Sequence, residues 1–156
     1  MIELVLAHTD LARVRFAHSP IRELVASLLT LQDRTHQVMH GSWLATVRPR
    51  LGDLRLELLT ALAPAGRYLP AFLLPAVTGP WPALGDELDA VAASPPAMVR
   101  DELDKLHEGR PLPATLRPLY EDPATHLAEV VEELDHYWRA AIHPVWQRVQ
   151  IGRAHV

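Results

Sequence analysis

Two groups of histidine and carboxylate side chains have a spacing that could hold a metal ion. His36 and His40 are four residues apart in a stretch that is predicted to be helical, so both imidazoles would lie on one face. No glutamate follows His36, so this pair is not part of the HExxH motif of zinc hydrolases. The sequence places no third ligand beside the pair, and we interpret both residues as surface histidines.

A second group lies at positions i, i+3, i+7 and i+10 of another predicted helix. Its members are His126, Glu129, Glu133 and His136. A di-metal bundle needs such side chains to point into the core. At 100° per residue the group lies opposite the apolar side chains of the same helix, so we expect it to face solvent. A free-standing helical metal-binding protein or enzyme that uses either group is the alternative function.

The other polar residues do not indicate acid–base or nucleophilic catalysis. Carboxylates are dense between 86 and 104, but they alternate with leucines as on helix surfaces, so we expect them to be solvated. These carboxylates belong to Asp86, Glu87, Asp89, Asp101, Glu102 and Asp104. The chain has no cysteine, no serine in a GxSxG turn and no glycine-rich phosphate loop. We therefore predict no enzyme activity, no catalytic residue, no bound metal and no cofactor.

The composition is that of a globular, mildly acidic protein. The chain has 156 residues, of which 49% are hydrophobic, enough for the core of one domain. The net charge of −4 disfavours binding to a phosphate backbone, which requires clustered lysine and arginine. No uncharged apolar run approaches the roughly 18 residues of a membrane span, and no signal peptide is recognisable. We expect a cytoplasmic protein that has no membrane partner.

Hydrophobic periodicity predicts a mainly α, multi-helix domain with a short N-terminal β-strand over 2–6. Ser19, Ser94 and Asp122 each precede a proline, which is typical of a helix start. Asp53 is a further candidate N-cap, and Pro49 is expected to end the helix before it. The predicted helices cover 20–33, 35–47, 54–63, 84–93, 95–108 and a last segment from 123 to Pro144, which kinks or ends it.

The proline-rich segment 64–82 is predicted to be an ordered loop. Its prolines prevent a regular helix, yet its aromatic side chains need burial. Core packing is the simpler interpretation of these aromatics. The alternative is an apolar ligand cavity. The candidate cavity residues are Trp43, Tyr68, Phe72, Trp81 and Trp138.

Three segments resemble a known family. They are DLARVRFAHSP at 10–20, YLPAFLLP at 68–75, and the stretch from Trp138 to Pro144 and Trp146. Together they resemble the N-terminal region of actinobacterial transcriptional regulators related to ArsR. The resemblance covers essentially 1–150 and is strongest over 10–24. Ala71 stands where the family usually has an acidic residue.

The resemblance implies a regulator whose N-terminal helical domain senses a small-molecule effector or supports a homodimer. In that family DNA is bound through a C-terminal winged helix-turn-helix, which this chain does not contain. We therefore expect 1–150 to be the regulatory or dimerisation domain and not to bind DNA specifically by itself. An interaction module without a ligand is a third interpretation.

The last six residues, 151–156, read IGRAHV. This peptide is one reading frame of a widely used sequencing adapter. We hypothesise that 151–156 derive from adapter DNA and that the gene itself continues differently after codon 150.

Overall fold

The computed structural model describes residues 18–33, 40–76 and 78–146. This part of the chain is mainly helical, with seven α-helices and no strand, which confirms the predicted fold class in its main feature. The strand predicted over 2–6 lies outside the described residues. None of the described helices combines the length and the apolarity needed to cross a bilayer.

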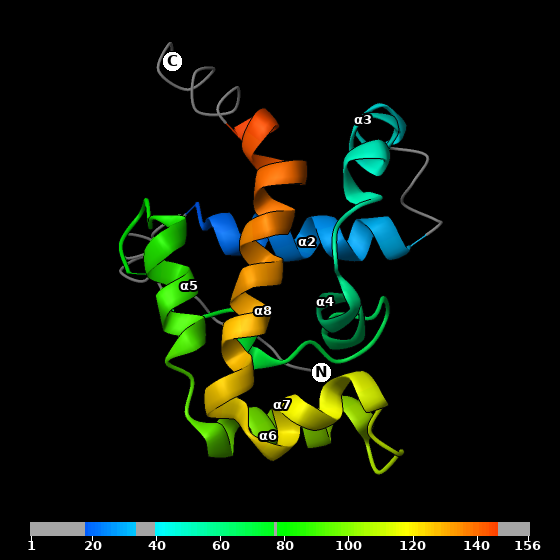
Figure 1. The fold of residues 1–156 in the computed structure, drawn as a ribbon. Helices are drawn as coiled ribbons and strands as arrows, with labels where there is room; N and C mark the ends of the chain where they lie inside the picture. Colours follow the sequence, from blue (N-terminus) through cyan, green and yellow to red (C-terminus); the bar gives the residue numbers. More distant parts are fainter. Residues whose placement is uncertain (1–17, 34–39, 77, 147–156) are drawn as a thin grey trace, which may run out of the picture.

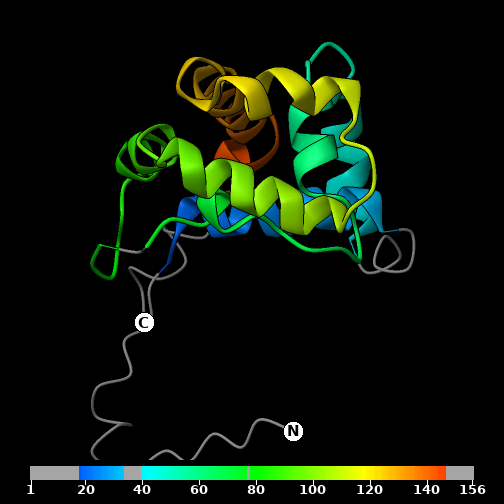
Figure 2. The same ribbon diagram turned by 90° about the horizontal axis from the view of Figure 1, so that it is seen from below.

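The helices are arranged around α8, which forms a central column (Figure 1). α5 and α4 pack on either side of it, α2 crosses behind, and α6 and α7 lie across its base. Seen from below, α6 runs from the α5 side to the α4 side (Figure 2). The α-helices are α2 (Pro20–Gln32), α3 (Gly41–Leu51), α4 (Glu57–Leu62), α5 (Leu84–Ala92), α6 (Pro96–His107), α7 (Arg117–Glu121) and α8 (Pro123–Tyr137). The shorter elements are the 3₁₀ turns η2 (Ala71–Leu73) and η3 (Ala114–Leu116) and the π-helix η4 (Trp138–Ile142).

Two of the predicted helix starts are confirmed. Ser19 Oγ accepts a hydrogen bond from Arg22 N at 3.2 Å, and Asp122 Oδ1 accepts one from Thr125 N at 3.3 Å. Each side chain thereby satisfies a free N–H group of the first turn. Ser94 is not a cap, because α6 begins at Pro96 without a side-chain cap.

Two predicted boundaries were wrong. Pro49 lies inside α3, which ends two residues later at Leu51. A proline removes only one backbone hydrogen bond, and this loss falls in the last turn. Asp53 does not cap the next helix, because α4 begins at Glu57 and its first turn is capped from another element.

The described part of segment 64–82 contains no α-helix, as predicted, and has one 3₁₀ turn, η2. Phe72 and Leu73 of this turn are buried in the core. The expected burial of the other aromatics was wrong, since Tyr68 is 39% exposed and Trp81 is 60% exposed. The segment packs against α6 through η2, and Glu102 of α6 accepts hydrogen bonds from Ala71 N and Tyr68 Oη.

Three glutamates that we expected to be solvated are buried. Glu87 and Glu102 are each 4% exposed, and Glu133 is 9% exposed. Each carboxylate accepts hydrogen bonds from the first turn of another helix, where N–H groups lack partners and the helix dipole favours negative charge. These three glutamates are therefore contacts between helices and not part of a solvated charged surface.

Glu87 of α5 connects to the start of α2. Its carboxylate accepts hydrogen bonds from Ser19 Oγ and from Ile21 N, the latter at 2.9 Å. Ser19 thus caps α2 with its own oxygen and donates its proton to Glu87. The start of α2 is tied to α5 by two hydrogen bonds.

Glu102 and Glu133 make similar caps with different electrostatics. Glu102 Oε2 accepts from Ala71 N and from Tyr68 Oη, each at 2.6 Å, and Lys105 Nζ donates to Oε1 at 2.7 Å. Burial opposes ionisation of Glu102, but these three donors outweigh it and lower its pKa. Glu133 Oε2 accepts from Leu59 N at 3.0 Å, and burial raises the pKa of this carboxyl.

Candidate functional site

A cavity of about 420 Å³ lies between α2, α3 and the C-terminal end of the helical column. Its volume is within the roughly 300–1,000 Å³ of small-molecule sites. Its walls combine aromatic and aliphatic side chains with a few polar groups. The lining residues are His18, Glu23, Ala26, Ser27, Thr30, His40, Trp43, Ile142, Val145 and Trp146.

One face of α2 forms the longest wall of the cavity. Glu23, Ser27 and Thr30 are spaced by four and three residues and therefore lie on the same side of the helix. The opposite side carries Ile21 and Leu24, which are completely buried in the core. The amphipathic pattern of α2 thus sends its apolar face inward and leaves its polar face to the cavity.

The second wall is the end of the column, where the helix widens into the π-helix η4. In η4 the N–H of His143 bonds to the carbonyl of Trp138, five residues earlier. Pro144 follows directly and has no N–H to offer to the preceding turn. The helix nevertheless continues over 143–146, so Pro144 does not end it. The π-turn therefore directs Val145 and Trp146 into the cavity wall.

Trp43 of α3 closes the cavity against this turn. Its indole Nε1 donates a hydrogen bond to the carbonyl oxygen of Ala141 at 3.3 Å. The only hydrogen-bond donor of the indole is thereby used, which leaves its ring as an apolar surface. Trp146 is braced from behind by Trp138, with the two rings edge to face and their centroids 5.4 Å apart.

A buried tyrosine lies beneath Ser27, at the base of the cavity. Ser27 Oγ donates to the carbonyl of Leu24 at 2.7 Å and lies 2.8 Å from Tyr137 Oη. Because the serine proton is used in the first bond, the tyrosine donates in the second. Tyr137 is completely buried, and this burial raises its pKa to about 12. Tyr137 is therefore a neutral structural support and not an acid or base.

The Glu23 carboxylate has a different environment from the three buried ones. It is exposed at the rim and makes no hydrogen bond or ion pair with any residue that the structure describes. The His40 side chain, across the cavity, is also exposed and has no such partner in the described part. Both groups are available to a ligand.

The five aromatics predicted to line a ligand cavity are not brought together. Trp43 lines the cavity, and Trp138 contributes to it only by supporting Trp146. Phe72 belongs to the core beneath η2, and Tyr68 is hydrogen-bonded to Glu102.

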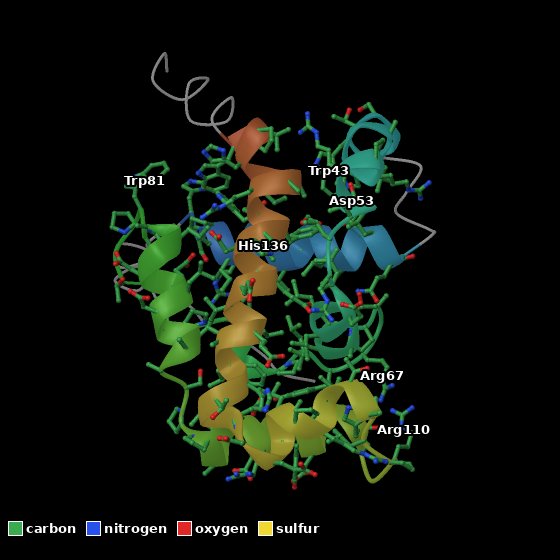
Figure 3. All side chains as sticks on the ribbon, in the orientation of Figure 1. Trp43, Asp53, Arg67, Trp81, Arg110 and His136 are labelled. Carbon is green, nitrogen blue, oxygen red and sulfur yellow. The ribbon has the colours of Figure 1, made fainter. Side chains whose placement is uncertain are left out.

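Trp81 lies in the loop before α5, on the other side of the column from Trp43 in the view of Figure 3. Its exposed ring stacks on His18, with centroids 4.8 Å apart and planes inclined by 23°. Since His18 lines the cavity, Trp81 contacts the outer side of its wall.

Sequence analysis missed Glu23, Ser27 and Trp146. The first two could have been found from the polar stripe at four-residue spacing on α2, opposite a fully apolar face. Trp146 gave no such signal, because its direction depends on the π-turn.

The predicted metal-ligand groups do not form a centre in the described residues. His36 lies outside them, and His40 is at the cavity rim. In the second group His126 Nδ1 pairs with Glu129 Oε1 at 2.8 Å at the surface, as expected for a solvent-facing set, whereas Glu133 is buried as a helix cap. No three potential metal ligands lie together in the part of the chain that the structure describes.

A larger groove of about 660 Å³ lies between α4 and α8. It is lined by five carboxylates and has no aromatic wall. The carboxylates belong to Asp53, Glu57, Glu129, Glu132 and Glu133, and the groove also contains Arg55 and His136. Its acidic lining is that of a hydrated surface, and its one buried carboxylate already serves α4.

His107 is the one buried histidine of the described chain, at the end of α6. Burial lowers its pKa, and Arg67 and Arg110 nearby lower it further. These two arginines lie at the far end of the molecule from Trp43 (Figure 3). His107 Nε2 is enclosed by protein atoms and has no partner in the described residues, although the residue also lines a pocket of about 390 Å³ together with Asp104 and Tyr120.

Comparisons of the chain with protein-family models, with curated proteins and with solved structures gave no match. The cavity beside η4 is the candidate functional site because it combines small-molecule size, two tryptophans and the Glu23 and His40 side chains, which have no partner among the described residues.

Proposed function

We propose that this chain is the regulatory domain of an ArsR-like transcriptional regulator and that the cavity beside η4 binds its small-molecule effector. The observation that carries the proposal is the tryptophan-lined cavity with an exposed carboxylate that has no partner in the described part of the chain. The resemblance of residues 10–24 and 68–75 to such regulators supplies the functional class.

The position of the cavity supports a regulatory role. Val145 and Trp146 line it, and the chain leads from these residues toward its C-terminal end. A ligand that binds one orientation of this segment better than another shifts the population of that orientation. DNA recognition is proposed to reside in a winged helix-turn-helix that follows residue 150 in the complete gene product.

The π-turn η4 supports this coupling between the cavity and the C-terminal segment. π-bulges interrupt regular helices and occur frequently at functional sites. Here the bulge carries the carbonyl that holds Trp43, so α3 and the end of the column share one hydrogen bond at the cavity. A ligand in the cavity would therefore contact α3 and the end of the column at the same time.

The test of this function uses the uninterrupted gene, read past codon 150. The full-length protein should bind promoter fragments of its own locus in an electrophoretic shift assay. Residues 1–150 alone should bind DNA weakly, and this binding should fall steeply with salt because it would rest on counterion release. Tight, sequence-selective binding by 1–150 alone would contradict the proposal.

The oligomeric state tests a second part of the proposal. A homodimer is expected for the full-length protein, and sedimentation velocity measures it directly. A monomer at the concentrations that saturate promoter DNA would exclude a role of this domain in dimerisation.

A further inference from the structure

We infer that the cavity beside η4 selects an apolar cation, that is, a molecule with a hydrophobic body and one protonated or quaternary amine. This inference rests on the proposed function in taking the cavity as the effector site. It goes further by assigning the chemical class of the ligand.

The charge of the lining is the first argument. Among the lining residues that the structure describes, Glu23 carries the only carboxylate and none is a lysine or an arginine. Among these residues an anion would find no permanent positive charge to compensate its loss of water, whereas a cation would find a carboxylate that has no described partner. The lining therefore favours positive over negative ligands.

The aromatic walls are the second argument. The rings of Trp43 and Trp146 both line the cavity, and the face of an indole attracts cations more strongly than other aromatic side chains do. Trp43 is held by its bond to Ala141 O, and Trp146 by its contact with Trp138. Both rings are thus fixed before a ligand arrives, which reduces the entropy lost on binding.

The position of the charge is the third argument. Glu23 is at the exposed rim, whereas Ile142 is buried at the inner side. A ligand with its apolar part at Ile142 and its ammonium group toward Glu23 would match both regions. The larger groove between α4 and α8 has more carboxylates but no tryptophan, tyrosine or phenylalanine among its described lining residues, so it does not offer this combination.

Three probes of nearly equal shape test the inference. They are 4-phenylbutyltrimethylammonium, its neutral analogue with a tert-butyl group in place of the trimethylammonium group, and 4-phenylbutanesulfonate. Binding to the 156-residue chain is measured by calorimetry and by tryptophan fluorescence. We expect the cation to bind about three- to tenfold more tightly than the neutral analogue, and the sulfonate to bind most weakly.

The variant Glu23→Gln keeps the shape and removes the charge. It should abolish most of the preference for the cation and leave the affinity for the neutral analogue unchanged. Glu132→Gln is the matched control, because Glu132 is an exposed glutamate of the other groove. It should leave all three affinities unchanged. Circular dichroism checks that both variants are folded.

The outcomes separate this inference from the proposed function. If the neutral or anionic probe binds as tightly as the cation and Glu23→Gln has no effect, the cavity still binds small molecules but the cation assignment is wrong. If Glu132→Gln reduces cation binding and Glu23→Gln does not, the cation binds in the other groove and the inference is overturned. If no probe binds at millimolar concentration, the inference is also overturned, and the proposed function is decided separately by promoter binding of the full-length protein.

Discussion

The four glutamates Glu23, Glu87, Glu102 and Glu133 all lie in helices, but they occur in two contrasting environments. The last three are buried, and each accepts hydrogen bonds from backbone N–H groups at the start of another helix. Glu23 is exposed beside two tryptophans and has no partner among the described residues. The contrast teaches that burial of a carboxylate goes with a structural role here, whereas the exposed carboxylate that has no described partner belongs to the candidate site.

The largest expected effect concerns a buried cap. Glu87→Ala should lower the free energy of unfolding by about 2–4 kcal/mol, because Ser19 Oγ and Ile21 N lose their acceptor in a buried place. Urea denaturation followed by circular dichroism measures the change. Asp89→Ala, at an exposed position of the same helix, should change it by less than about 0.5 kcal/mol. Equal effects of the two substitutions would mean that the cap is not structural.

The next comparison is between the pH dependences of two caps. The pKa of Glu133 is raised by burial, so its contribution to stability is present below the ordinary value of 4.5 and is lost as pH rises through the folded-state value. The pKa of Glu102 is lowered, so its contribution is present above 4.5 and is lost as pH falls through the folded-state value. Lys105 and Tyr68, which donate to Glu102 alone, explain the difference.

The measurement uses Glu133→Gln and Glu102→Gln, each unfolded with urea from pH 3.5 to pH 8. Acidification should raise the stability of the wild type relative to Glu133→Gln and lower it relative to Glu102→Gln. Each change should be smaller than the effect of Glu87→Ala, because the side chain keeps its shape and one acceptor oxygen. The same sign for both variants would show that the environments of the two caps do not differ as described.

A smaller effect is expected beneath the cavity. Tyr137→Phe should destabilise the protein by about 0.5–1.5 kcal/mol, since Ser27 loses one hydrogen bond but still donates to Leu24 O. Tyr120→Phe is the control, because its bond to Asp104 is longer, at 3.3 Å, and is exposed. In a spectrophotometric titration one tyrosine should ionise only near pH 12, and Tyr137→Phe should remove it. Persistence of that step in the variant would assign it to another residue.

The smallest effect is expected at Glu23. Glu23→Gln should change the free energy of unfolding by less than about 0.5 kcal/mol, since only the favourable interaction of a carboxylate with the first turn of α2 is lost. Thermal denaturation at neutral pH measures this change. A loss of about 2 kcal/mol or more is what removal of a buried, hydrogen-bonded charge is expected to cost. Such a loss would show that Glu23 has a structural role like that of the three buried glutamates.

The local signals in the sequence predicted much of the fold. Ser19 with Pro20 and Asp122 with Pro123 begin helices as expected, because a cap and a proline at the first turn act on neighbouring N–H groups. The non-α character of segment 64–82 also followed from its prolines. Asp53 shows the limit of this reasoning, since a suitable cap residue was present but a distant glutamate took the role.

The sequence around the three buried glutamates contains a pattern that indicates their burial, although their charge suggests exposure. Each is followed by leucine and aspartate, in Glu87-Leu88-Asp89, Glu102-Leu103-Asp104 and Glu133-Leu134-Asp135. Each also has an apolar residue three positions before it and another four positions after it. This helical phase places the glutamate on the core side, next to its leucine. Phase, rather than the density of charges, would have predicted their burial.

By itself the sequence determined the mainly helical fold and two helix starts, because periodicity and capping act over one or two turns of the chain, but it did not predict α7 or the bounds of α3 and α4. It also determined that Pro144 would disturb the last helix. Only the tertiary structure decided which glutamates cap another helix, since the N–H groups that Glu87 and Glu133 accept from lie 66 and 74 residues away. The cavity likewise forms only where α2, α3 and the π-turn meet, because Trp43 and the carbonyl that it binds are 98 residues apart.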